Sequence, residues 1–170
     1  MELIKNLFKI KIEKLSIDGI LGVATGGIAH AMFLNTQFRL PFGYVRLDAK
    51  AYGLGKNIEG IDVLWKTIVV IEDTVSTGGS LLDSIKILKD SGASFVYPLC
   101  IYSHEMEESK KGFEEAGYIL EPLITFTDVI YSEKAKEMIS PEEYILLLSW
   151  KSNPKDWFEK FKDFFEPETA

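Results

Sequence analysis

Hydrophobic residues follow two spacings along this chain, and their alternation predicts strands separated by helices. Between Glu2 and Leu15 apolar residues recur every three or four positions, which is typical of an amphipathic helix. Apolar runs with the length of buried strands follow at 20–24, 42–46, 67–71, 94–102 and 118–123. Helical spacing returns between them at 28–35, 80–90 and 106–116. The pattern predicts an α/β fold, with a parallel sheet and helices on both of its faces.

After residue 127 the spacing becomes helical throughout. Helices are predicted at 128–138 and 142–150, and a third begins at Asn153 and Pro154, which are a good cap and a good first residue. Aromatic residues line one side of that last helix and indicate packing on the domain or on a partner chain. We therefore divide the chain into a core of residues 1–127 and a helical C-terminal extension of residues 128–170 packed on the same domain.

The segment 69–80 combines a buried strand, two acids and a glycine-rich turn without interruption. Glu72 and Asp73 come at the carboxyl end of the predicted strand, which is the ligand-binding edge of a parallel sheet. Carboxylate oxygens there can bind a divalent cation or ribose hydroxyls. The turn that follows opens a helix, so its backbone amides and hydroxyls can hold a phosphate. Its residues are Thr74, Val75, Ser76, Thr77, Gly78, Gly79 and Ser80.

Simpler interpretations exist for each part of this segment. Acids at a strand end are often only solvated, and Ser80, with Asp83 three residues later, also predicts an ordinary helix cap. The strand, the two acids and the glycine-rich turn follow each other in an order that favours a binding site. Two other glycine turns match nucleotide motifs poorly: 22–27 lacks the G-x-G-x-x-G spacing, and 53–57 lacks the Ser or Thr that follows the lysine of a P-loop.

The segment 69–80 resembles the phosphoribosyl-pyrophosphate motif of type I phosphoribosyltransferases. Segments 22–28 and 41–46, Lys50 and segment 53–56 are similar to the orotate phosphoribosyltransferase branch. The resemblance runs from about Leu21 to Thr127, with a weaker echo to Trp157. It implies a Rossmann-like type I phosphoribosyltransferase core. It also implies transfer of the 5-phosphoribosyl group from phosphoribosyl pyrophosphate to orotate, which gives orotidine monophosphate and pyrophosphate.

The resemblance also assigns roles to individual residues. Glu72 and Asp73 would bind the ribose hydroxyls and organise Mg²⁺, mainly through substrate and water, while residues 74–80 would hold the 5-phosphate. The turn of Thr25, Gly26 and Gly27 resembles the pyrophosphate loop. The segment 47–62, rich in glycine and without a sustained period, resembles a catalytic loop that reaches across a homodimer. The catalytic candidates are Asp73, Lys50, Arg46 and Tyr52, and Lys56 is a further substrate-binding candidate.

The chain departs from the family pattern on the side that selects the base. Leu47 and Tyr52 stand where the family usually has lysine and histidine, and Ser103-His104 stands where it has an arginine for the orotate carboxylate. The family's N-terminal cover of the base is expected to be absent before Met1. His104 remains a candidate substrate-binding residue. Two alternatives stay open: a phosphoribosyl-pyrophosphate-binding regulatory protein without efficient catalysis, and a transferase for another base.

Composition narrows the class of protein. A formal net charge of −7 argues against a nucleic-acid-binding surface, although Arg39, Arg46 and Lys66 are predicted to join an anion-facing cluster with nearby lysines. No apolar run approaches the roughly 20 residues that span a bilayer, and no cleavage-site pattern is present. The single Cys100 lies in an apolar run, which predicts that its thiol is buried in the core. A lone cysteine cannot form an intrachain disulfide, which is consistent with a reducing cytoplasm.

Overall fold

A six-stranded sheet forms the centre of the computed structural model, which describes residues 2–48 and 57–165. The strand order is β3-β2-β1-β4-β5-β6, and every neighbouring pair is parallel except β2 with β3. The predicted α/β fold is therefore confirmed. The strands are β1 (Gly19–Val23), β2 (Phe42–Val45), β3 (Ile58–Glu59), β4 (Thr67–Val75), β5 (Phe95–Ser103) and β6 (Glu121–Thr125).

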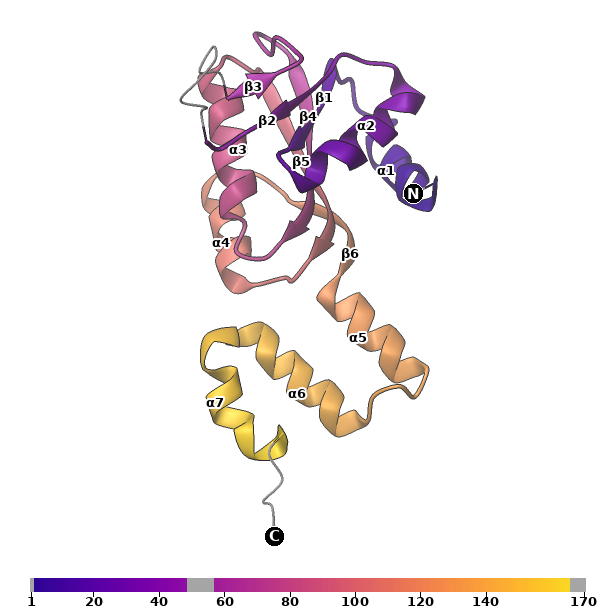
Figure 1. Ribbon diagram of the computed structural model, residues 1–170, viewed down its shortest axis with the longest axis vertical. Coiled ribbons are helices and arrows are strands. Elements are labelled where there is room, and N and C mark those ends of the chain that lie inside the picture. The colour runs from indigo at the N-terminus through magenta and orange to yellow at the C-terminus, as the bar shows by residue number, and fades with distance from the viewer. Residues whose placement is uncertain (1, 49–56, 166–170) are drawn as a thin grey trace.

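Helices cover both faces of the sheet (Figure 1). On one face α1 (Glu2–Ile12) and α2 (Gly26–Phe38) bury Phe8, Ile12 and Leu34 against Val69 and Ile71. On the other face α3 (Gly79–Asp90) and α4 (Glu107–Glu115) pack on the alternate residues of β4, which include Ile68 and Val70. Successive side chains of a strand point to opposite faces, so an unbroken apolar run is what this two-sided burial requires.

Several boundaries differ from their predictions. β4 continues through Val75 instead of ending at Ile71, so both acids lie inside the strand. The last strand begins at Glu121, because Gly117 turns the chain at φ +75° and Ile119 is left 81% exposed. The prediction that Ser80 caps α3 was wrong. Gly78 is the N-cap and makes no side-chain cap hydrogen bond.

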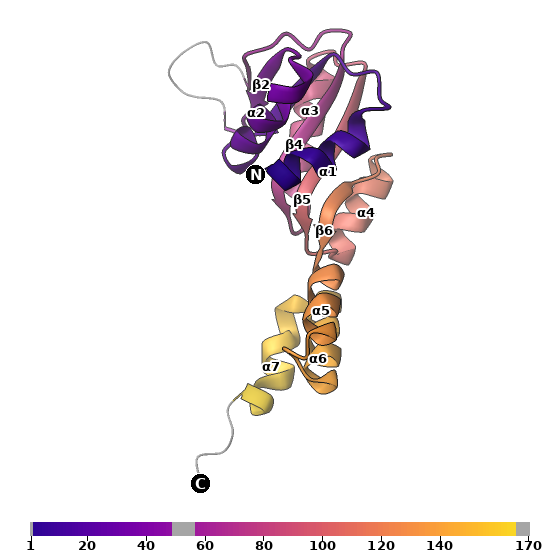
Figure 2. The ribbon, with the colours of Figure 1, turned by 90° about the vertical axis from the view of Figure 1, so that its right-hand side faces the viewer.

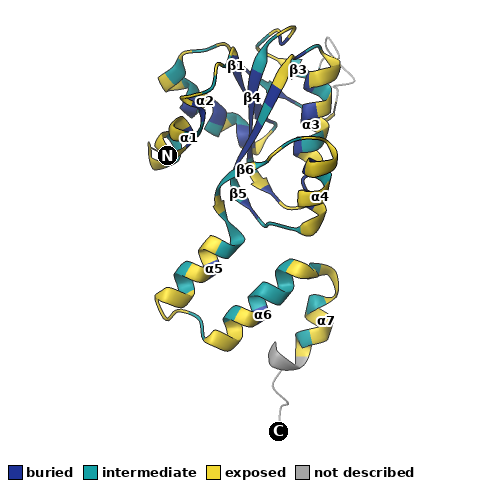
Figure 3. Cartoon of the chain, turned by 180° about the vertical axis from the view of Figure 1, so that it is seen from behind, coloured by how far each residue is buried: buried dark blue, intermediate teal, exposed yellow. Residues whose placement is uncertain are grey.

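Three helices continue beyond β6 and form what we call the C-terminal arm, residues 126–165. They are α5 (Phe126–Ala135), α6 (Pro141–Ser152) and α7 (Pro154–Phe165), and they extend away from the sheet (Figures 1 and 2). Capping boxes begin α5 and α6, and Asn153 Oδ1 accepts a hydrogen bond from Asp156 N, as its predicted capping role requires. Most of the arm is exposed or half-buried (Figure 3).

Within the described ranges, no helix has both the length and the apolar character needed to cross a bilayer. Cys100 is fully buried in the core, as its apolar surroundings predict, and burial raises the pKa of its thiol to about 12.

Candidate functional site

The site is an open pocket at the carboxyl edge of β4. Glu72 lines it and is only 7% exposed, because it lies in the last, well-packed part of the strand. The rest of the lining comes from the turn between β4 and α3. We call residues 74–80 the donor loop, and all seven of them line the pocket together with Leu81.

The donor loop turns sharply to bring the N-terminus of α3 to the pocket. Gly78 makes this turn at φ +88°, a conformation that side chains rarely adopt, and a Cβ there would lie 3.0 Å from the Phe113 ring. Val75 buries its side chain in the core, whereas Ser76 and Thr77 are exposed. The first amides of α3 and the loop hydroxyls are therefore placed to bind an anion.

A second glycine turn meets β4 from the neighbouring strand. We call Thr25, Gly26 and Gly27 the glycine loop; it follows β1 and begins α2. A Cβ on Gly26 would overlap the carboxylate of Asp73, and one on Gly27 would overlap the carbonyl oxygen of Ile71. Only glycines allow this approach. The structure therefore brings the glycine loop and the acid pair together at one edge of the sheet.

The two carboxylates differ in environment. Burial, which is the largest cause, and the neighbouring Asp73 side chain together raise the pKa of Glu72 to about 8, against a lowering contribution from the hydrogen bond that Asp73 N donates to Glu72 Oε1 at 3.2 Å. Asp73 is half-buried and its Oδ1 accepts a hydrogen bond from Thr74 N at 2.8 Å. In the ligand-free protein the Glu72 carboxyl therefore binds a proton more tightly than an ordinary glutamate does.

A divalent cation would find only part of its coordination shell here. Carboxylate oxygens are ligands that Mg²⁺ prefers, and Glu72 and Asp73 supply them. In the part of the chain that the structure describes, no group of three or more His, Cys, Asp or Glu gathers to hold a metal ion. The two carboxylates therefore fit an ion that is held mainly by substrate oxygens and water.

Arg46 lies directly after β2, at the same edge of the sheet. Its Nη1 is 3.5 Å from Glu59 Oε1, and its backbone N–H donates to Asn57 O at 2.8 Å. Tyr44 donates a hydrogen bond to Glu59 Oε2 at 2.7 Å, which raises the pKa of the phenol. The short strand β3 thus positions an acidic partner for Arg46. The other three cationic or hydroxyl candidates, Lys50, Tyr52 and Lys56, lie outside the described residues.

Arg39 and Lys66 do not join Arg46, so the predicted anion-facing cluster was wrong for these two residues. Lys66 immediately precedes β4 and Arg39 precedes β2, whereas Arg46 follows β2. Because these strands run parallel through β1, Arg46 lies at the opposite edge of the sheet from the other two.

His104 follows β5, and its backbone N–H donates to Val75 O at 2.9 Å, so it lies beside the donor loop. Its ring contacts Tyr102 and Trp150, with centroid separations of 4.9 Å and 5.7 Å. Its Nδ1 is buried and has no hydrogen-bond partner among the described residues. Trp150 comes from the C-terminal arm, 46 positions along the chain, and no local pattern in the sequence links it to His104.

An ion pair also holds the C-terminal arm at the end of β5, next to His104. Lys151 Nζ is 3.1 Å from Glu105 Oε1 and donates to Thr127 Oγ1 at 3.0 Å, while Thr127 N donates to Glu105 Oε2 at 2.8 Å. Burial alone would raise the pKa of Glu105, but the hydrogen bonds from Thr127 and Lys151 outweigh it and lower the pKa.

Comparison with known proteins agrees with this geometry. Residues 1–115 match the phosphoribosyl transferase domain. The orotate phosphoribosyltransferase of Streptococcus sanguinis is 38% identical over 149 residues, which cover 88% of this chain and 71% of the relative. That of Lactococcus lactis is 34% identical over 148 residues, covering 87% and 71%.

Solved structures share the fold. The orotate phosphoribosyltransferase of Aeropyrum pernix superposes with a TM-score of 0.66 at 24% identity, over 77% of this chain and 74% of that one. The fold, the glycine loop facing the acids and the extent of the sequence match together identify the family. The chain belongs to the phosphoribosyltransferases, in the orotate phosphoribosyltransferase branch.

Proposed function

We propose that the protein transfers the 5-phosphoribosyl group from phosphoribosyl pyrophosphate to orotate and releases pyrophosphate. One observation carries the proposal: the donor loop lines a pocket together with Glu72, and the glycine loop meets the neighbouring Asp73, so anion-binding amides lie on two sides of the carboxylate pair. The relatives at 34–38% identity are orotate phosphoribosyltransferases, which supports orotate as the acceptor.

In this arrangement each part of the donor has a partner. The 5-phosphate binds the amides and hydroxyls of the donor loop, and the ribose hydroxyls bind Glu72 and Asp73. The glycine loop and Arg46 meet the pyrophosphate. A ring nitrogen of the base attacks the anomeric carbon, the carbon–oxygen bond to pyrophosphate breaks, and its electron pair leaves with the pyrophosphate oxygen. The proton of the ring nitrogen passes to solvent.

Fixed amides and cations accelerate such a reaction because they stabilise the charge that develops on the leaving group. Mg²⁺, held through Glu72, Asp73 and substrate oxygens, would supply further neutralisation there. We also propose a homodimer in the cytoplasm, in which the segment containing Lys50, Tyr52 and Lys56 completes the pyrophosphate side.

A panel of bases tests the proposed function. The chain is incubated with phosphoribosyl pyrophosphate, Mg²⁺ and, separately, orotate, uracil, adenine or hypoxanthine, and released pyrophosphate is measured. Orotate is expected to give the highest kcat/KM. Turnover with only one of the other bases would mean that this base, and not orotate, is the acceptor. Tight binding of phosphoribosyl pyrophosphate without turnover on any base would favour a regulatory protein.

A further inference from the structure

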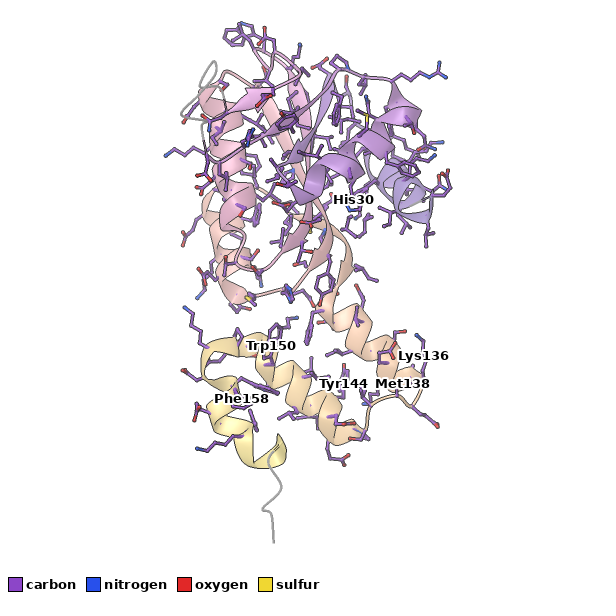
Figure 4. The ribbon with its side chains drawn as sticks, viewed as in Figure 1. His30, Lys136, Met138, Tyr144, Trp150 and Phe158 are labelled. Carbon is purple, nitrogen blue, oxygen red and sulfur yellow. The ribbon has the colours of Figure 1, made fainter. Side chains whose placement is uncertain are left out.

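The C-terminal arm continues from β6 and packs against the end of β5, at the functional edge of the sheet. Trp150 lies near the end of α6 that faces the core, whereas Phe158 lies on α7, away from it (Figure 4). The Trp150 ring packs edge-on against His104 at a centroid separation of 5.7 Å, and tilted against Phe126 at 5.0 Å. Lys151, the next residue, fixes this end of α6 to Glu105.

His104 is held between this arm and the donor loop. Its backbone N–H bonds to the carbonyl of Val75, which directly precedes Ser76. Tyr102 packs on the imidazole from β5, so Tyr102 and Trp150 together restrict the plane of the ring. Because Nδ1 is buried without a partner among the described residues, Nε2 is the ring nitrogen that can meet a ligand.

The position of Tyr102, His104 and Trp150 assigns them to the part of the site that binds the acceptor base. The donor loop and the glycine loop occupy the edge around β4 and bind the charged ends of the donor. The neighbouring strand β5 ends in aromatic side chains and an imidazole, which suit a flat heterocycle with hydrogen-bonding edges.

We infer that Trp150 is a positioning residue for the acceptor base: it holds the His104 ring so that Nε2 faces the base, and the C-terminal arm thereby forms part of the acceptor side of the site. The inference rests on the proposed function, since it assumes a base beside the donor pocket. It gives the arm a role in choosing the acceptor and none in binding the donor.

Two substitutions at one position separate this role from a structural one. Trp150→Phe keeps an aromatic ring against His104, and Trp150→Leu keeps apolar bulk without a ring. For the leucine variant we expect the KM for orotate to rise about three- to tenfold, the factor that corresponds to loss of an aromatic contact. The phenylalanine variant restores most of the affinity for orotate. The Kd for phosphoribosyl pyrophosphate, measured by calorimetry, is expected to stay within about twofold in both variants.

Phe158→Leu is the matched control, because it changes an aromatic residue of the same arm that is 53% exposed and lies on α7, away from the core (Figure 4). It is expected to leave both constants unchanged. An unchanged KM for orotate in Trp150→Leu overturns the inference. An equal weakening of donor binding also overturns it, because the residue then supports the whole domain. Wild-type protein that turns over no base contradicts the proposed function itself, and this is seen before any variant is compared.

Discussion

The Cα of Gly26 faces the carboxylate of Asp73 so closely that a methyl group on Gly26 would overlap it. This contact joins the turn after β1 to the acid pair of β4, two segments almost fifty residues apart in the sequence. It explains why Gly26 lacks a side chain, and the close approach of Gly27 to the carbonyl oxygen of Ile71 explains the next position. The relative placement of the two anion-binding loops depends on it.

Gly26→Ala is expected to impair turnover more than folding. The added methyl group must displace the Asp73 carboxylate or the glycine loop, and a displacement of about 1 Å at a reacting centre can lower the rate roughly 100-fold. We therefore expect kcat/KM to fall by about one to two orders of magnitude. Gly112→Ala is the control, since its Cβ would meet only the flexible end of Leu82 and α4 lies outside the pocket. Equal activity of the two variants would contradict the proposed contact.

Gly27→Ala is expected to act on stability. Its Cβ would overlap the backbone carbonyl of Ile71, which cannot rotate away as a side chain can. Overpacking of this kind costs about 1–3 kcal/mol. Urea unfolding monitored by circular dichroism measures the loss, again against Gly112→Ala, which should be neutral or stabilising by up to about 1 kcal/mol because alanine favours a helix. A loss below the error of the measurement would mean that α2 does not pack on β4 this closely.

Glu72 gives the ligand-free protein a pH-dependent stability. Its pKa is raised from 4.5 in the unfolded chain to about 8 in the folded protein, so the folded state binds the extra proton between these values. The stabilising contribution is complete below about pH 4.5 and is lost as the pH rises to about 8. We expect thermal unfolding of Glu72→Gln to show a flatter profile than wild type between pH 5 and 8. Identical slopes would show that Glu72 is ionised throughout.

The ion pair of Glu105 and Lys151 is expected to stabilise the attachment of the arm. Lys151→Gln should speed amide hydrogen exchange in α6 by a factor that corresponds to about 1 kcal/mol or less, because both side chains are 28% exposed, and leave β4 unchanged. Because the pKa of Glu105 is lowered in the folded protein, the ion pair stabilises the arm at pH values above the usual carboxyl pKa. This stabilisation is lost as the pH falls below that range. Lys136→Gln, which breaks an exposed pair with Glu133 in the same arm, should have no such effect (Figure 4). Faster exchange across the whole chain would count against a local attachment.

Local patterns were sufficient to predict the layers of the fold and the position of the acid pair. The two-sided burial of β4 appears in the sequence as an unbroken apolar run, and Gly78 marks the turn into α3 because the turn needs a positive φ. The end of β4 was harder to predict, because Glu72 and Asp73 resemble loop residues although they belong to the strand. Only backbone pairing with β5 extends the strand that far.

Contacts between distant segments could not be predicted from local patterns. The pairing of Arg46 with Glu59 depends on β3, which has only two residues and therefore no periodicity to detect. The contact of His104 with Trp150 depends on how the arm folds back to the end of β5. The His104 contact lies on the side of the site that selects the base, where the sequence departs from the family pattern.

Binding of phosphoribosyl pyrophosphate tests the central claim most directly. Calorimetric titration of the full chain, with and without Mg²⁺, is predicted to show one saturable site that Mg²⁺ strengthens, and Asp73→Asn should weaken the Mg²⁺-dependent part about tenfold or more. Absence of binding under both conditions, or equal binding by wild type and Asp73→Asn, would contradict the assignment of the donor site to the carboxyl edge of β4.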